Sequence, residues 1–304
     1  MATSVSLTYL VTTRNKLPTL REVVTRLLKN LQPDEELMVV DAASTDGTTQ
    51  YLRELERAGR VHQLISEPDR CEAHGYNKGL LQARGAVIKL ISDDDAFHWA
   101  SIQACKRFLL DHPEIDLLGA DGAGVDWNST DSFSFSTHRH CFENYRANKV
   151  PFDFPMPGLM LRKSSLPVTG LFDLRYLRLD FEFGLRTTTG PANLAWYTGR
   201  TWVRIQNPAS QSVTSHDRII SDTIRLNRYY GVIHTEPSEG ALIKDALRSL
   251  ARPIKRKLSK SVPPGLALSE SSAQAPTDWT PVFDRCDAWL DAENRAHPGE
   301  FLTR

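Results

Sequence analysis

Short apolar runs alternate with amphipathic stretches over the first third of the chain. Val5–Val11 is the first apolar run and Leu37–Val40 is the second. Between them, apolar side chains recur at helical spacing after Pro18, which predicts a helix. The same alternation predicts further helices over 48–58, 73–83 and 99–110, and further strands over 61–66, 86–91 and 115–119. It therefore favours an α/β fold with a mostly parallel central sheet flanked by helices.

The pattern changes in the second half of the chain. Asp126–Arg139 is polar and rich in Ser and Thr, which predicts a hairpin or an excursion loop. Beyond it we expect strands over 158–161 and 202–205 and helices over 179–188 and 219–230. These elements place one α/β domain at residues 1–230.

A C-terminal extension is expected over residues 231–304. It contains a basic segment, Arg252–Lys260, followed by a linker over 261–276 that is rich in Ser, Pro and Ala. A short helix is predicted over Val282–Glu293. The basic segment is either a solvated linker helix or a peripheral contact with an anionic membrane surface.

Charge and cysteine content narrow the class of protein. The 304 residues carry 37 Lys plus Arg and 37 Asp plus Glu, so we expect no nucleic-acid partner. The 4 cysteines are scattered without a C-x-x-C pair, which favours a reducing compartment over a disulfide framework. We expect no signal peptide and no membrane span, and therefore a cytoplasmic protein, with the inner membrane face as a further place of contact.

Three adjacent carboxylates follow the buried strand predicted over 86–91. We call Ser92–Asp95 the acidic strand end. Ligands of parallel α/β sheets bind beyond the carboxyl ends of the strands. Adjacent carboxylates repel one another, and hard oxygen ligands suit Mg²⁺ or Mn²⁺, so a divalent cation would compensate them. The alternative is a solvated turn that caps the next helix.

Several segments, in this order, resemble family 2 glycosyltransferases, the large inverting family with the GT-A fold. The resemblance covers roughly residues 4–217 and is carried by Val11–Asn15, Val39–Thr48, Ser66–Arg70, Asn77–Gly79, Ala83–Gly85, Ser92–Asp95, and Gly170–Asp173 with Asp180 and Arg186. It implies a GT-A fold with a C-terminal helical extension and a role in polysaccharide biosynthesis. The implied enzyme moves a sugar, most often from a UDP-sugar, to a hydroxyl of a glycan or lipid-linked saccharide.

The resemblance also implies roles for individual residues. Asp180 is the expected general base, with Glu182 in reserve, since this chain has Leu179-Asp180 where relatives often have Glu-Asp. The metal, Mn²⁺ or Mg²⁺, is expected on Asp93 and Asp95, the literal D-x-D spacing, although Asp94 and Asp95 match the paired acids of relatives. A late histidine, His216, is a loose candidate for completing the metal shell. The expected nucleotide-sugar contacts are Thr12, Arg14, Asp41, Asp69, Arg70, Lys78, Asp93 and Asp94.

Structural alternatives exist for several of these residues. Asp41 could be a turn acid, and Asp180 a helix N-terminal acid stabilised by the macrodipole. Lys78 could be an exposed helix lysine. Asp46 and Gly47 are expected to make a turn and cap the following helix.

Two other functions compete with glycosyl transfer. A sugar-nucleotide nucleotidyltransferase usually has a Gly-rich first loop, but residues 12–17 contain no glycine. A non-catalytic sugar-nucleotide or carbohydrate-binding module would not need Asp41, the acidic strand end and Asp180 together. A Rossmann oxidoreductase is disfavoured because no G-x-G-x-x-G follows the first strand.

Overall fold

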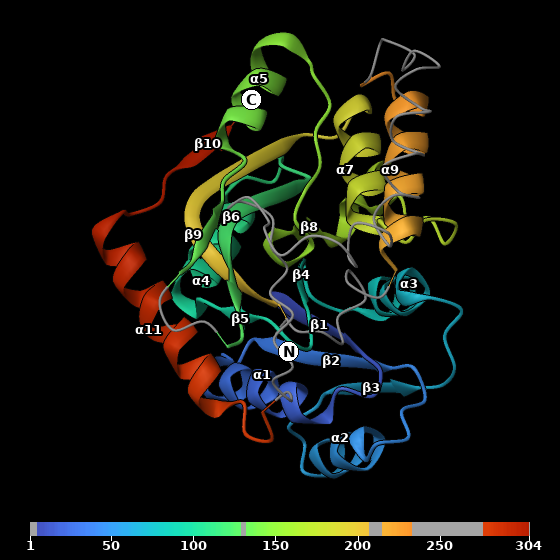
Figure 1. The fold of residues 1–304 in the computed structure, drawn as a ribbon, viewed down its shortest axis with the longest axis vertical. Helices are drawn as coiled ribbons and strands as arrows, with labels where there is room; N and C mark the ends of the chain where they lie inside the picture. The colour runs from blue at the N-terminus through green and yellow to red at the C-terminus, as the bar shows by residue number, and fades with distance from the viewer. Residues whose placement is uncertain (1–4, 129–131, 207–214, 233–275, 304) are drawn as a thin grey trace, which may run out of the picture.

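A computed structural model describes residues 5–128, 132–206, 215–232 and 276–303 (Figure 1). Its core is one twisted sheet with the strand order β10-β9-β6-β8-β4-β1-β2-β3. Helices cover both faces of the sheet (Figure 1). This arrangement confirms the α/β class expected from the alternating pattern.

Four strands from the first third of the chain form a wholly parallel half of the sheet. They are β1 (Leu7–Thr13), β2 (Glu35–Asp41), β3 (Gln63–Ser66) and β4 (Val87–Ile91). Every residue of β2 and β4 is buried, as expected for continuous apolar runs covered on both faces. We call these four strands the parallel half.

The other half of the sheet is mixed. β8 (Met160–Arg162) runs antiparallel to both β4 and β6 (Leu117–Asp126), while β6 and β9 (Leu194–Gln206) are parallel. β10 (Phe301–Thr303) is antiparallel to β9 at the sheet edge. Two short strands complete this mixed half: β5 (Ala96–Phe97) pairs with β9, and β7 (Ser134–Ser136) pairs with β6, which confirms the predicted hairpin.

Two layers of helices enclose the sheet. One apolar cluster joins it to α1 (Leu17–Asn30), α2 (Thr48–Arg57), α4 (Trp99–Asp111) and α11 (Thr280–Ala296). A second cluster joins the opposite face to α3 (Glu72–Gln82), α5 (Arg139–Asn148) and α7 (Leu179–Thr189). The remaining helical segments are η1 (Met156–Gly158), η2 (Lys163–Ser165), α6 (Leu166–Thr169) and α9 (His216–Tyr229), which packs beside α7.

The end of the chain is part of the sheet and of its helical cover. α11 buries Val282, Phe283, Cys286 and Leu290 in the first cluster, and β10 extends the sheet. Arg26 of α1 forms ion pairs with two carboxylates of α11. These are Asp284 and Asp287, and the contact with Asp287 is 2.6 Å long. The predicted terminal helix is thus confirmed and is longer than expected. The basic segment 252–260, and the linker up to residue 275, lie outside the described residues.

Close packing of α3 on β1 accounts for the glycine in Asn77-Lys78-Gly79. A Cβ atom at Gly79 would lie 2.2 Å from Cδ1 of Leu10, a buried β1 side chain. A larger residue would push α3 away from the sheet. The motif therefore fixes how near α3 lies to the strand ends of the parallel half.

Candidate active site at the carboxyl edge of the sheet

The parallel register brings four strand ends to one edge. Thr13 is opposite Asp41, and Asp41 is opposite Ser66, so β1, β2 and β3 end level with one another. Val11 is opposite Ile91, so the acidic strand end continues beyond β4 at the same edge. The predicted gathering of polar side chains at this edge is thereby observed.

Asp95 is the most deeply held residue of the acidic strand end. It is 5% exposed, and it accepts hydrogen bonds from the Ser92 hydroxyl at 2.5 Å and the Ile205 amide at 3.1 Å. Burial, with repulsion from Asp94, raises the pKa of Asp95 to about 7. Burial and the charge of Asp94 also raise the pKa of Asp93 well above its usual range. The edge therefore holds more negative charge than its surroundings stabilise.

Lys16 supplies a positive charge to this edge. Its ammonium group lies 2.9 Å from Oδ2 of Asp94, and both side chains are mostly buried. Although burial opposes the charged form, the contact with Asp94 raises the pKa of Lys16, with smaller effects from Asp93 and Asp95. No sequence motif singled out Lys16, although Lys16 directly follows the first-strand segment that ends at Asn15.

Two more carboxylates approach the edge from helix N-termini. Asp180, in the first turn of α7, accepts a hydrogen bond from the Phe181 amide at 2.8 Å. Burial raises the pKa of Asp180, while Arg178 and Arg204 partly oppose this. Glu72, in the first turn of α3, is exposed to solvent. Partial loss of hydration beside neighbouring protein atoms, followed by repulsion from Asp180, raises its pKa to about 7.

The chemistry of these donors fits a hard divalent cation. Carboxylates whose pKa values are raised by burial and mutual repulsion gain from a nearby positive charge. Within the part of the chain that the structure describes, no three Asp, Glu, His or Cys side chains are arranged to hold a metal ion by themselves. Mg²⁺ is commonly held by one or two carboxylates together with substrate phosphates and water, so the protein need supply only part of the shell.

Asp41 is the centre of a hydrogen-bond network. It is fully buried, and Oδ1 accepts from the Ser44 amide at 3.1 Å and the Ser44 hydroxyl at 2.5 Å. Oδ2 accepts from Thr49 at 2.6 Å and Ser66 at 2.8 Å. A carboxylate has about four acceptor sites, so these bonds use its capacity. In this structure Asp41 joins β2, α2 and β3, and any effect on a nucleobase would pass through the hydroxyls that it orients.

The adjacent turn follows the structural expectation. Gly47 has φ 95°, a left-handed conformation that favours glycine. Asp46 accepts from the Thr48 amide at 3.1 Å and from the Leu17 amide at 3.0 Å. Asp46 therefore accepts hydrogen bonds from the first backbone amides of both α2 and α1, which have no partner within their helices.

Asp69 and Lys78 are paired with each other. Nζ of Lys78 lies 2.5 Å from Asp69 and 3.1 Å from Glu67, and His74 lies 3.3 Å from Asp69. Burial disfavours the charged form of Lys78, but the hydrogen bonds to Asp69 and Glu67 outweigh this and raise the pKa of Lys78. The structure thus brings two of the predicted nucleotide contacts together on the α3 side of the edge.

The other predicted contacts lie in the loops around this pair. Arg14 and Arg70 are exposed, and Thr12 at the end of β1 is half-buried. His216 begins α9, but its side chain lies outside what the structure describes.

Glu182, the second candidate for the general base, is buried and takes part in hydrogen bonds that hold α7 in place. It is 3% exposed and accepts from Arg186 at 2.8 Å and from the Tyr230 hydroxyl at 3.1 Å. Arg186 also donates to the carbonyl oxygens of Thr169 and Leu171. Glu182 therefore stabilises the packing of α7, and Asp180 is the better candidate for a base.

Long-range contacts add residues that sequence patterns did not reveal. The Asn77 side chain donates to the Phe172 carbonyl and accepts from the Phe172 amide, both at 2.8 Å, and so ties α3 to the segment before α7. Arg204 of β9 acts electrostatically on both Asp95 and Asp180. Asn77 lay in a recognised motif, but no local signal connects Arg204 with residues that lie far from it in the sequence.

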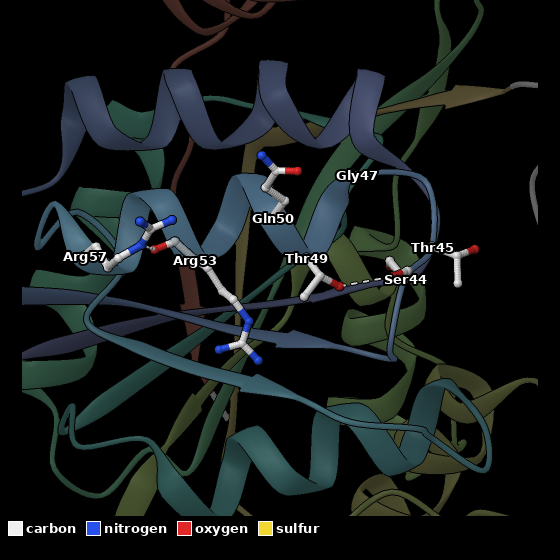
Figure 2. A pocket seen from close by; sticks show the side chains of 7 residues that line it. All are labelled: Ser44, Thr45, Gly47, Thr49, Gln50, Arg53 and Arg57. Carbon is white, nitrogen blue, oxygen red and sulfur yellow. Dashed lines mark hydrogen bonds between the residues drawn. The ribbon is translucent and has the colours of Figure 1, made fainter.

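A surface hollow of about 380 Å³ lies beside this edge on α2 (Figure 2). Figure 2 shows Ser44 and Thr45 at one end and the side chains of Arg53 and Arg57 along the helix. None of the predicted site residues lines this hollow. The candidate site is therefore the edge of the sheet that carries the acidic strand end, and not this hollow.

Comparison with known proteins agrees with the order of the motifs. The sequence pattern described as glycosyl transferase family 2 matches residues 8–166. TuaG of Bacillus subtilis (strain 168), named as a teichuronic acid biosynthesis glycosyltransferase, is 25% identical over 114 residues, which are 35% of this chain and 45% of TuaG.

Solved structures share the fold. A crystal structure of S. aureus TarS 1-349 in complex with UDP-GlcNAc has a TM-score of 0.54 at 18% identity, covering 94% of this chain and 83% of that one. The mannosyltransferase PcManGT from Pyrobaculum calidifontis, in complex with GDP-Man and Mn²⁺, has a TM-score of 0.55 at 17% identity, covering 96% and 75%. The chain spans about half the length of some of these relatives, 45% of TuaG and 46% of a longer TarS chain.

The matched pattern covers β1 to β8. This part of the chain includes the four strands of the parallel half and the acidic strand end. The solved structures extend the likeness in fold to the mixed half of the sheet. This chain belongs to glycosyl transferase family 2, and its fold is of the GT-A type.

Proposed function

We propose that this protein is an inverting glycosyltransferase that moves a sugar from a nucleotide-diphosphate sugar to an acceptor hydroxyl. The observation that carries the proposal is the meeting of the acidic strand end, Lys16 and Asp180 at one edge of the sheet. Family membership supports the same reaction class. A nucleotidyltransferase is less favoured because residues 12–17 contain no glycine for a Gly-rich first loop, and a non-catalytic module would not need this set of groups.

In the proposed reaction the donor diphosphate lies over the ends of β1 and β4. When bound, Mn²⁺ or Mg²⁺ would be held by Asp93, Asp94 or Asp95 and would stabilise negative charge on the departing diphosphate. Lys16 adds a positive charge there. Thr12, Arg14, Arg70 and the pair of Asp69 and Lys78 are proposed to bind the nucleoside, with Asp41 orienting the loop hydroxyls.

Asp180 is proposed to remove the proton from the attacking acceptor hydroxyl. A base must be charged and yet hold a proton strongly enough to accept it during attack. Burial raises the pKa of Asp180, and the raised value favours proton acceptance near neutral pH. Arg178 and Arg204 keep the charged form accessible.

The donor and acceptor are part of the proposal. A UDP-sugar is the first candidate, because TarS was crystallised with UDP-GlcNAc, and GDP-mannose is the second, because PcManGT was crystallised with it. The name of TuaG supports a glycan or lipid-linked saccharide as acceptor in polysaccharide biosynthesis. No helix among the described residues is long and apolar enough to span a bilayer. Peripheral contact at the inner membrane face through residues 252–260 remains a proposal.

Release of nucleoside diphosphate from a donor panel tests this function. Wild-type protein with Mn²⁺ should release UDP or GDP from one of UDP-glucose, UDP-GlcNAc or GDP-mannose, first by slow hydrolysis and faster with an acceptor. Asp180→Asn should bind the same donor and lose the acceptor-dependent rate. Folded protein that neither binds nor turns over any of a complete set of nucleotide sugars would contradict the proposal.

A further inference from the structure

We propose that Lys16 is an exchangeable counter-ion: it holds Asp94 in the nucleotide-free protein and yields that carboxylate to a divalent cation when a nucleoside diphosphate binds. The inference rests on the proposed function and assigns to Lys16 the coupling between metal and donor binding. Its basis is the ion pair at 2.9 Å between Lys16 and Asp94 in the acidic strand end.

The backbone on both sides of Lys16 is fixed. The Asn15 amide donates to the Ser44 hydroxyl at 2.8 Å, and the Asn15 side chain accepts from the Thr45 amide at 2.8 Å. On the other side, the Leu17 amide donates to Asp46 at 3.0 Å. Because the main chain is held at both neighbours, exchange of partners would need only rotation of the flexible lysine side chain.

The surroundings of the pair favour exchange over a permanent structural role. The side chains of Lys16 and Asp94 are 24% and 19% exposed, so solvent and ligands reach both. Asp95, by contrast, is 5% exposed, and its two oxygens already hold Ser92 and Ile205. Asp94 is thus the member of the acidic strand end whose cationic partner lies at a reachable position.

A metal ion and the Lys16 ammonium group would compete for one carboxylate. Without nucleotide, a metal ion drawn to Asp94 would weaken the ion pair and repel the Lys16 ammonium group. A bound diphosphate offers Lys16 a new anionic partner, and an ammonium group is a common phosphate ligand. Diphosphate binding should therefore strengthen metal binding and, by linkage, metal should strengthen diphosphate binding by the same factor.

Titration of Mn²⁺, followed by its paramagnetic resonance signal, tests this exchange on the full-length protein. In the absence of nucleotide, Lys16→Met should bind Mn²⁺ about fivefold more tightly than wild type or better, the lower range of typical site coupling. The factor by which UDP strengthens Mn²⁺ binding should shrink in this variant. Lys16→Arg, which keeps the charge, should stay close to wild type.

Lys29→Met is the matched control for net charge. Lys29 is an exposed residue in the last turn of α1, the helix that directly follows Lys16, so its loss changes the total charge equally but not the acidic strand end. It should leave Mn²⁺ affinity near the wild-type value. Lys16→Gln, checked for folding by circular dichroism, replaces Lys16→Met if that variant is unstable.

The outcomes separate this inference from the proposed function. Wild-type protein that binds UDP with Mn²⁺, combined with a Lys16→Met variant whose nucleotide-free Mn²⁺ affinity is unchanged or weaker, overturns the exchange alone. No binding of Mn²⁺ or UDP to any folded variant overturns both. A gain of the same size in Lys29→Met would reduce the effect to net charge and also overturn the role of Lys16.

Discussion

The parallel half and the mixed half of the sheet place charge at the candidate site in different ways. In the parallel half, several charges come from short loops directly after strands, as with Lys16 after β1 and the acidic strand end after β4. The mixed half contributes Asp180 and Arg204 from segments that are distant in sequence. We therefore propose that the first half forms the donor-binding surface and that the second side of the site supplies the base.

The two halves are joined at the site by specific hydrogen bonds. Asp95 accepts from Ile205 of β9, and Asn77 of α3 exchanges two bonds with Phe172. These bonds fix where the base lies relative to the acidic strand end. Variants that act on one half, on the other, or on the joint between them should accordingly differ in what they change.

The largest effect is expected from the base of the mixed half. Asp180→Asn should lower the sugar-transfer rate by about 10²–10⁴-fold, the usual contribution of a general base. Donor affinity, measured by calorimetry, should stay near wild type because the parallel half is intact.

Glu182→Gln is the matched control on the same helix. It removes an ion pair with Arg186 and should lower the free energy of unfolding, while the rate per folded molecule stays close to wild type. If Glu182→Gln abolishes transfer and Asp180→Asn does not, the roles assigned to the two acids are reversed.

A smaller effect is expected at the joint between the halves. Asn77→Ala removes two buried hydrogen bonds to Phe172 and leaves its backbone groups unpaired, which should cost about 2–4 kcal/mol in the free energy of unfolding. Urea denaturation measures this loss. Asn148→Ala, at an exposed position, should change stability little. Equal stability of the two variants would show that the joint contributes nothing.

The smallest effect concerns the pH dependence of stability. The pKa of Glu72 is about 7 in the folded protein, against an ordinary value of 4.5. Between pH 4.5 and pH 7, the folded protein therefore keeps a proton on Glu72 that the unfolded chain has lost. The contribution of Glu72 to stability is thus lost as pH rises through the folded pKa.

Glu72→Gln should remove part of this decline. Because Glu72 is exposed to solvent, the effect should be small. The melting temperature of the Glu72→Gln variant should exceed that of wild type by no more than about 2–4 °C at pH 8 and should equal it near pH 4.5. Scanning calorimetry of the metal-free protein measures the difference. A larger gap at pH 4.5 than at pH 8 would contradict the raised pKa of Glu72.

Sequence patterns predicted the parallel half well because its signals are local. Apolar runs such as Leu37–Val40 became buried strands, and the polar residues after them reached one edge through the parallel register. Asp46 and Gly47 formed the expected turn. The family resemblance, based on motifs in the same order, was confirmed by the match over residues 8–166.

The mixed half was predicted less completely because its pairing is long-range. The strand expected over 202–205 belongs to β9, which begins at Leu194 and pairs with both β6 and β10. Nothing local indicated that residues 301–303 would close the sheet edge. The network around Asp41 and the ion pair of Lys16 also depend on packing between separate loops, and the site roles of the predicted residues stay predictions.

Calorimetric titration of UDP and GDP, with and without Mn²⁺, tests the proposed donor site most directly. Wild-type protein and Asp111→Asn, an exposed control, should bind one nucleotide tightly only with Mn²⁺, and Asp94→Asn should lose most of the Mn²⁺-dependent gain. That result would support a donor site at the acidic strand end. Metal-dependent binding that is unchanged in Asp94→Asn, or no binding to well-folded wild-type protein, would contradict it.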